Sequence, residues 1–314
     1  MSLVDIEKVN TITSIGGGPI GGGWSAHFLA KGFKVKSYIH SMDEYQDFMK
    51  IINTAWKSLK GLGLSDQASL DNLTVTSSLE EATYNSEFIQ ESAPENLSLK
   101  QVLYKKLGDL VKNNVVIASS TSGLMMSDIQ KECSTPERTI VGHPFNPPYL
   151  LPLVEIVAGK KTSVEYIDWL KKFYEKTDKV PLVLKKEIPG FIATRLQEAL
   201  WREALYMVDN DEASPEDIDL ALKNGPGPRM SVQGQCMAFH VACGEGGMAT
   251  NLDQFGPALK LPWTRLKAPE LTKELRDKMV KGCNNMSKDT NFEKLAEKRD
   301  SMIVSVLNAI KLNK

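Results

Sequence analysis

A glycine turn near the start of the chain constrains the fold more than any other feature. The run Gly16-Gly17-Gly18-Pro19-Ile20-Gly21 lies between a strand predicted at 9–15 and a helix predicted at 21–31. Glycine accepts the backbone angles of a tight turn and lets backbone N–H groups approach a pyrophosphate, while the helix N-terminus adds partial positive charge. A tight turn without a ligand is the alternative, but the strand–turn–helix context favours a dinucleotide site. We assign its contacts to Gly16, Gly18, Pro19, Ile20 and Gly21.

The order of the elements extends this reading to the whole chain. Strand-like segments are predicted at 9–15, 33–39, 73–76, 88–91, 115–118, 139–143, 154–157 and 180–184, with helices at 21–31, 42–59 and 99–111. Such alternation indicates a parallel sheet wrapped by helices. After Pro189-Gly190 only helical periodicity remains. We therefore predict an α/β fold, with an N-terminal Rossmann-type, doubly wound parallel sheet at 1–188 and an all-helical C-terminal domain at 189–314 that binds substrate and dimerises.

Charge and composition exclude several classes of protein. The formal net charge of −1 gives no attraction for nucleic acid or a membrane surface. The chain contains no apolar stretch of about 18 residues, as a membrane span requires, and its start lacks the basic and apolar regions of a signal peptide. We expect a cytoplasmic protein without a metal site. The four cysteines, whose spacing fits neither zinc nor a disulfide framework, are Cys133, Cys236, Cys243 and Cys283.

Two segments contain residues suited to acid–base chemistry. His143 opens the run His-Pro-Phe-Asn-Pro, and Glu155 follows twelve residues later at the next predicted strand. A histidine can take the proton of a secondary alcohol as hydride leaves its carbon, and a carboxylate on the far ring nitrogen fixes the tautomer. Strand capping is the alternative for His143. Ser122, in the polar turn 119–123, can bond a substrate oxygen, although such turns also serve as caps.

Together these segments resemble the 3-hydroxyacyl-CoA dehydrogenase family over nearly the full length of the chain. The resemblance rests on the glycine turn, the pair Glu95 and Lys100, Ser122, the HPFNP loop and the spacing to Glu155. It implies that NAD is the cofactor. It also implies that the histidine is the general base, that the glutamate pairs with it, and that the serine binds the substrate oxygen. Contacts with the nicotinamide half of NAD fall on Glu95, Lys100 and Asn146.

Within this family, several stretches are more similar to enzymes of L-carnitine than to the acyl-CoA enzymes. They are 55–56, 89–92, 149–152, 198–206, 254–260 and 262–264. The lysine-rich helix that binds the CoA nucleotide is not apparent, since residues 50–60 contain only Lys50, Lys57 and Lys60. We expect a small quaternary-ammonium 3-hydroxy acid as substrate, with L-carnitine oxidised to 3-dehydrocarnitine.

Such a substrate needs partners for a cation and a carboxylate. Aromatic faces suit an ammonium that cannot donate hydrogen bonds, and Phe145 and Phe255 are the first candidates. Trp201 and Trp263 are further candidates, with packing as the alternative. Arg229, in Gly-Pro-Arg-Met, can clamp the carboxylate, with a surface or capping role as the alternative.

The chain departs from the family at two positions. The acyl-CoA enzymes have asparagine where this chain has Thr194 in Phe-Ile-Ala-Thr-Arg. Threonine keeps a hydroxyl, so we include Thr194 among the catalytic residues. Ile39 stands at the strand end where an acidic residue normally binds the adenosine ribose. Asp43 lies four residues further and is our candidate to replace that acid, and this turn contains no arginine for a 2′-phosphate. We expect NAD to be preferred with weak discrimination at the ribose, and the alternative is that His40 and Ser41 favour a 2′-phosphate.

Three other functions remain open from the sequence. The substrate could be another small 3-hydroxy acid such as L-gulonate, or a 3-hydroxyacyl-CoA, or the protein could bind the nucleotide without turnover. The apolar residues around Trp201 and on the last helix favour a homodimer through the C-terminal domain. Sedimentation at micromolar concentration tests that expectation, and a monomer would reject it.

Overall fold

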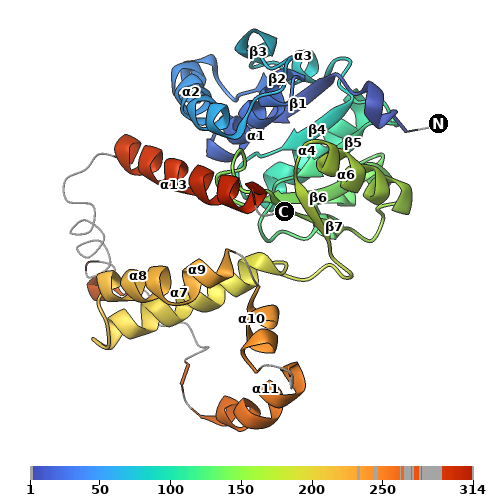
Figure 1. Ribbon diagram of the computed structural model, residues 1–314. Coiled ribbons are helices and arrows are strands. Elements are labelled where there is room, and N and C mark those ends of the chain that lie inside the picture. Colours follow the sequence, from blue (N-terminus) through green and yellow to red (C-terminus); the bar gives the residue numbers. More distant parts are fainter. Residues whose placement is uncertain are drawn as a thin grey trace. The chain divides into compact units, whose positions relative to one another are not determined.

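The chain divides into two compact units, Met1–Thr194 and Arg195–Lys314. The computed structural model describes residues 3–231, 234–243, 247–261, 263–264, 270, 272–275, 277 and 292–312. The first unit is built on an eight-stranded sheet with the order β3-β2-β1-β4-β5-β6-β7-β8, shown in blue to green (Figure 1). The predicted domain boundary at 188/189 stays a prediction.

The strands of the first unit lie within two residues of those predicted. They are β1 Thr11–Ile15, β2 Lys34–Tyr38, β3 Leu73–Thr76, β4 Phe88–Glu91, β5 Val116–Ser119, β6 Thr139–Pro144, β7 Leu153–Ala158 and β8 Val180–Val183. The helices are α1 Pro19–Ala30, α2 Tyr45–Leu62, α3 Leu79–Thr83, α4 Leu97–Leu110, α5 Met126–Ile129 and α6 Val164–Lys176. This confirms the predicted Rossmann-type α/β fold. The strand order reverses between β1 and β4, and such a switch point opens a crevice for a dinucleotide.

One strand pair differs from the predicted parallel sheet. Strands β6 and β7 are antiparallel, whereas the other neighbouring pairs are parallel. The reason is the connection, since parallel neighbours need a crossover of about a dozen residues or more. Only residues 145–152 join β6 to β7. The reversal brings His143 directly opposite Glu155 in the ladder.

A buried aromatic cluster packs α1 and α6 together over β4. Trp24 and Phe28 stack at 5.2 Å between ring centroids, and Phe173 lies 4.5 Å from Phe88. Trp24 also stacks on Tyr174 at 5.7 Å. Helix α1 is buried along most of its length, so its position against the sheet is fixed by packing on every side. The glycine turn that precedes α1 is fixed with it.

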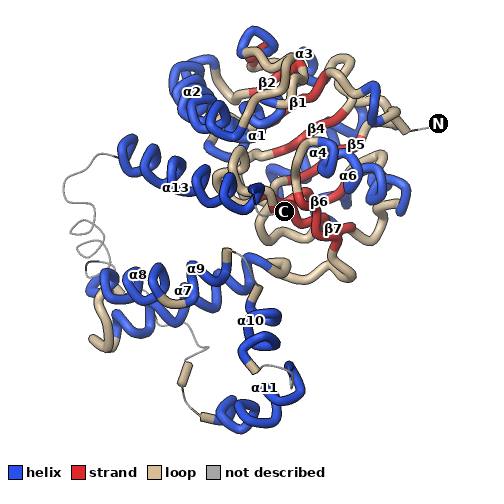
Figure 2. The backbone as a smooth tube through the Cα atoms, viewed as in Figure 1, coloured by secondary structure: helices blue, strands red, loops and turns tan. Residues whose placement is uncertain are grey.

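The described part of the second unit contains helices and no strand, as Figure 2 shows, and this confirms the predicted helical C-terminal region. Its helices are α7 Ala193–Asp209, which begins at the end of the first unit, α8 Pro215–Asn224, α9 Pro226–Met230, α10 Gln235–Ala242, α11 Gly247–Phe255 and α13 Phe292–Leu312. Helix α8 begins with a capping box in which Ser214 and Asp217 bond each other's backbone N–H groups. None of the helices in the described residues is both long and apolar enough to cross a membrane.

Candidate active site

The glycine turn has the shape that a pyrophosphate requires. Gly16 has φ of 124°, and a Cβ there would lie 2.4 Å from the carbonyl oxygen of Ser92. A Cβ on Gly21 would lie 2.1 Å from the carbonyl oxygen of Gly16, whereas one on Gly18 would meet nothing within 4 Å. Gly18 caps α1 without a side-chain hydrogen bond, and Pro19 begins the helix. The N-terminal N–H groups of α1 therefore have no side-chain cap, and no side chain covers the backbone at Gly18. The site fits the phosphates of a dinucleotide.

His143 and Glu155 form a buried pair at the ends of β6 and β7. The Nδ1 atom of His143 lies 2.9 Å from Oε2 of Glu155. The other oxygen, Oε1, accepts hydrogen bonds from the backbone N–H groups of Ile192 and Ala193, each at 2.9 Å. Burial would raise the pKa of Glu155, but the bonds from His143, Ala193 and Ile192 outweigh it and hold this pKa below its ordinary value. Glu155 is therefore a carboxylate at neutral pH.

The pairing fixes the chemistry of the imidazole. A carboxylate on Nδ1 keeps the proton of the neutral ring on that nitrogen and leaves the lone pair on Nε2. Within the residues that the structure describes, Nε2 has no hydrogen-bond partner. The rings of Phe145 and Phe191 lie 5.3 and 5.5 Å from the imidazole and limit its movement. His143 is thus suited to accept a proton at Nε2.

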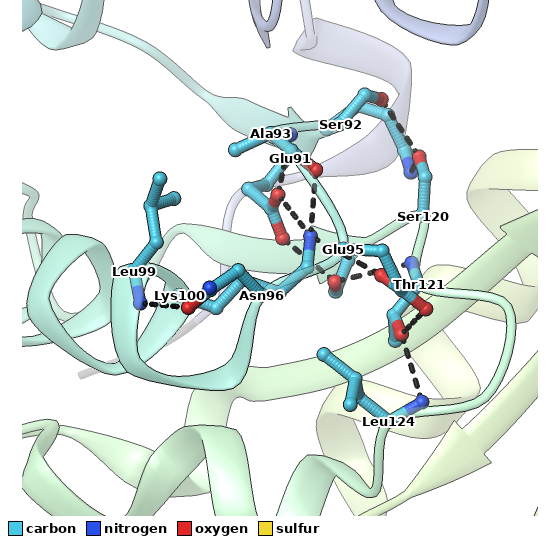
Figure 3. A network of polar contacts seen from close by, with 12 residues as sticks. Glu91, Ser92, Ala93, Glu95, Asn96, Leu99, Lys100, Ser120, Thr121 and Leu124 are labelled. Carbon is cyan, nitrogen blue, oxygen red and sulfur yellow. Dashed lines mark hydrogen bonds and ion pairs between the residues drawn. The ribbon is translucent and has the colours of Figure 1, made fainter.

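A second buried ion pair joins Glu91, at the end of β4, to Lys100 of helix α4 (Figure 3). Lys100 donates from Nζ to Oε1 of Glu91 at 2.6 Å and to the carbonyl oxygen of Ala93 at 3.0 Å. Glu91 also accepts from Ser119 Oγ at 2.7 Å and from the N–H of Ala93 at 2.6 Å. Both charged side chains are almost wholly buried. A role for Lys100 in contacting NAD stays a prediction, and the contacts that the structure gives it are with Glu91, Ala93 and, at 3.9 Å, Glu95.

Glu95 joins the turn after β4 to the turn after β5. Its Oε1 accepts from Thr121 Oγ1 at 2.6 Å, from the N–H of Ser122 at 2.9 Å and from Ser122 Oγ at 3.3 Å. The sequence predicts that Glu95 contacts the cofactor and that Ser122 binds the substrate oxygen, and these two residues are in contact. Ser122 and Asn146 are both exposed, as groups that meet a ligand must be. Their roles stay predictions.

Two buried groups behind the site were not predicted. Gln90 donates to Ser120 Oγ at 2.8 Å and to the carbonyl oxygen of Gly142 at 3.2 Å, so it ties β4 to the residue before the histidine. Lys179 donates to the carbonyl oxygens of Pro148 and Leu151 in the loop after the HPFNP run. Burial lowers the pKa of Lys179 to about 7. Polar residues within a strand predicted to be buried were the available signal for Gln90, whereas nothing in the sequence separates Lys179 from its neighbours.

The remaining candidates are spread over the two units. Thr194 ends the first unit and is half-buried in the first turn of α7. Arg229 on α9 and Phe255 at the end of α11 belong to the second unit, and both are exposed. Their substrate roles stay predictions. No group of three or more histidine, cysteine or acidic side chains suited to a metal occurs among the residues described.

Comparison with known proteins agrees with the two halves of the structure. Residues 11–188 match the model of the 3-hydroxyacyl-CoA dehydrogenase NAD binding domain, and residues 190–288 match the C-terminal domain of the same family. The chain is 50% identical to an L-carnitine dehydrogenase of Streptomyces coelicolor over 303 residues, which is 96% of this chain and 95% of that one. It is 44% identical to the L-carnitine dehydrogenase of Pseudomonas putida over 98% of this chain and 96% of that one.

The fold has a solved counterpart of almost the same extent. The crystal structure of 5-formyl-3-hydroxy-2-methylpyridine 4-carboxylic acid 5-dehydrogenase, an NAD⁺-dependent dismutase, superposes with a TM-score of 0.81 at 24% identity. The match covers 96% of this chain and 99% of that one. The matched domain models, the relatives and the geometry of the glycine turn and the His143–Glu155 pair agree: this chain belongs to the 3-hydroxyacyl-CoA dehydrogenase family and is an NAD-dependent dehydrogenase.

Proposed function

We propose that this protein oxidises the 3-hydroxyl group of L-carnitine to give 3-dehydrocarnitine, with NAD as the oxidant. The observation that supports the chemistry best is the buried pair of His143 and Glu155, with Nε2 of the histidine unpartnered in the described residues. The substrate is inferred from relatives that are 41–50% identical over nearly the whole chain and that are named L-carnitine dehydrogenases.

The pair performs the proton part of the reaction. Nε2 of His143 takes the proton of the substrate hydroxyl, and the imidazolium that forms is stabilised by the carboxylate of Glu155. The glycine turn would hold NAD, which would supply the acceptor for the hydride of C3. We assign the hydrogen bond to the substrate oxygen to Ser122, which Glu95 orients through Oε1. Thr194 is a second candidate for that bond.

The cationic end of carnitine needs an aromatic partner close to the base. Phe145 meets this requirement, since it is half-buried and its ring contacts that of His143 edge-on. Phe255 is a second candidate, and Arg229 is our candidate for the carboxylate. A CoA thioester would need basic residues to bind the CoA nucleotide, and residues 50–60 of α2 contain few of them. One of these, Lys50, donates a hydrogen bond to Asp47 at 2.8 Å. This arrangement favours a small substrate over a CoA thioester.

A substrate panel tests the proposal directly. We expect NADH to form with L-carnitine and NAD, and not with 3-hydroxybutyryl-CoA or L-gulonate, when absorbance is followed with purified protein. Activity on the thioester without activity on carnitine would reject the substrate and leave the family and the cofactor in place. NADH binding without turnover on any member of the panel would support a nucleotide-binding protein instead.

Replacing Phe145 with alanine tests the cation site. A desolvated cation–π contact is worth about 2 kcal/mol, so the KM for L-carnitine should rise by roughly 30-fold with a smaller change in kcat. The matched probe is 3-hydroxy-5,5-dimethylhexanoate, in which carbon replaces the quaternary nitrogen and the charge is lost. Its KM should change much less. An equal rise for both compounds would mean that Phe145 acts through shape alone.

Helix α7 carries exposed apolar side chains that bear on the assembly of the protein. Leu196, Leu200 and Trp201 of α7 are exposed in the described chain, and a second copy would cover such a surface. A homodimer and a cytoplasmic location both stay predictions.

A further inference from the structure

The strand end that normally supplies an acid for the adenosine ribose is occupied by Ile39. Its side chain is fully buried, and its backbone N–H bonds the carbonyl oxygen of Thr76. A Cβ built on Gly17, in the middle of the glycine turn, would lie 3.2 Å from Cγ2 of Ile39. The isoleucine therefore fills the position next to the turn without offering any group to a ribose hydroxyl.

A carboxylate from the next turn reaches the same point. The Oε2 atom of Glu44 lies 2.9 Å from the Cβ position of Gly17, closer than any atom of Ile39. Glu44 ends the short 3-10 helix Met42–Glu44 and precedes α2. Its side chain is exposed, and in the part of the chain that the structure describes no hydrogen bond or ion pair engages its carboxylate. The group is thus both placed at the turn and free to bind.

The neighbouring acid is used differently. Oδ2 of Asp43 accepts a hydrogen bond from Ser41 Oγ at 3.1 Å, and the backbone N–H of Asp43 bonds the same hydroxyl. Asp43 therefore closes its own turn, while the carboxylate of Glu44 lies beside Gly17. Asp43 was the sequence candidate for the missing acid, and these contacts favour its neighbour.

The surrounding charges would disfavour a 2′-phosphate. The sequence contains no lysine or arginine between Lys36 and Lys50. The Nζ atom of Lys36 donates to the carbonyl oxygen of Tyr84 at 2.8 Å, and Lys50 pairs with Asp47. A phosphate beside Glu44 would therefore meet a like charge with no lysine or arginine of residues 37–49 to offset it and with His40 as the one basic side chain of that segment, whereas two ribose hydroxyls would meet a hydrogen-bond acceptor.

We propose that Glu44 binds the 2′- and 3′-hydroxyls of the adenosine ribose and makes the protein select NAD over NADP. Glu44 thus replaces, from the start of α2, the acid that is absent at the end of β2. The inference rests on the dinucleotide site of the proposed function and not on carnitine as the substrate.

Binding of reduced cofactors without substrate tests this assignment. The fluorescence of the nicotinamide is titrated for NADH and NADPH with the wild type, Glu44→Gln and the matched control Asp43→Asn. A hydrogen bond to a charged group corresponds to about 10- to 100-fold in affinity, so Glu44→Gln should lower the preference for NADH by at least about tenfold. Asp43→Asn removes the same charge one residue away and should change the preference by less than about twofold, because exposed charges are screened.

The 2′-deoxyadenosine analogue of NADH gives a second measurement. The wild type should bind it about tenfold more weakly than NADH, and Glu44→Gln should bind both alike. An unchanged preference in Glu44→Gln, an equal shift in Asp43→Asn, or a variant that still discriminates against the analogue would each overturn the assignment. Wild-type protein that binds NADH but leaves carnitine unreacted would overturn only the proposed substrate, since no substrate enters the titrations.

Discussion

Replacing His143 with glutamine should lower kcat for L-carnitine by about 10²- to 10⁴-fold, the usual loss when a positioned general base is removed. Glutamine can still donate a hydrogen bond toward Glu155, so the buried carboxylate keeps a partner and the protein should fold. It has no lone pair of suitable basicity at the position of Nε2. The loss should therefore appear in kcat more than in KM.

Two measurements accompany this variant. NADH binding, measured by fluorescence, should be unchanged, because the glycine turn joins β1 to α1 and His143 lies in β6. The melting temperature should stay close to that of the wild type. A companion variant, Glu155→Gln, should also lose most of its activity, because its amide NH2 would donate to Nδ1 of His143 and place the ring proton on Nε2, where the base needs its lone pair. A His143→Gln protein with more than about half of the wild-type kcat would remove His143 from the mechanism.

The second large effect concerns stability. Lys100→Met should lower the free energy of unfolding by about 3–5 kcal/mol, because it leaves the carboxylate of Glu91 buried without its cation. The side chain of Glu91 is 0% exposed and that of Lys100 is 1% exposed, so water cannot replace the lost partner. Urea denaturation followed by circular dichroism measures the change.

Two further variants isolate the cause of this loss. Lys106→Met removes an exposed lysine from the same helix and should change stability by no more than about 0.5 kcal/mol. Adding Glu91→Gln to Lys100→Met removes the buried charge and should recover part of the stability. If Lys100→Met unfolds like the wild type but binds NADH poorly, the lysine acts on the cofactor and not on Glu91.

The sequence was sufficient for the strands and for the glycine turn because both depend on local rules. Short apolar runs between turn residues mark buried strands, and these segments were located within two residues of their observed bounds. Helix α6 shows the limit of that reading, since no predicted element covers it. Its buried residues Tyr166, Trp169, Leu170 and Phe173 follow helical spacing, so the signal was present.

The residues of the site were harder to predict from the sequence, because the site depends on contacts between elements that are distant in the chain. Glu91 ends an all-buried strand, and only the structure shows that Lys100 neutralises it from the following helix. The same holds for the ribose acid. Asp43 and Glu44 are adjacent in the sequence, and which carboxylate turns toward Gly17 depends on the hydrogen bond that Ser41 makes. Sequence spacing identifies such residues as candidates, and the contacts made in the folded protein determine which of them faces the site.

The antiparallel pairing of β6 and β7 has a consequence for how this enzyme can evolve. His143 and Glu155 face each other because they are partners in one ladder, and a slip of one residue would turn the glutamate to the opposite face of the sheet. An insertion of one residue inside either strand would break this pairing, whereas a change in the length of the connection at 145–152 would leave the ladder in register. We therefore expect a change of substrate to be tolerated more readily in that connection, beside Phe145, than in the two strands that hold the acid–base pair.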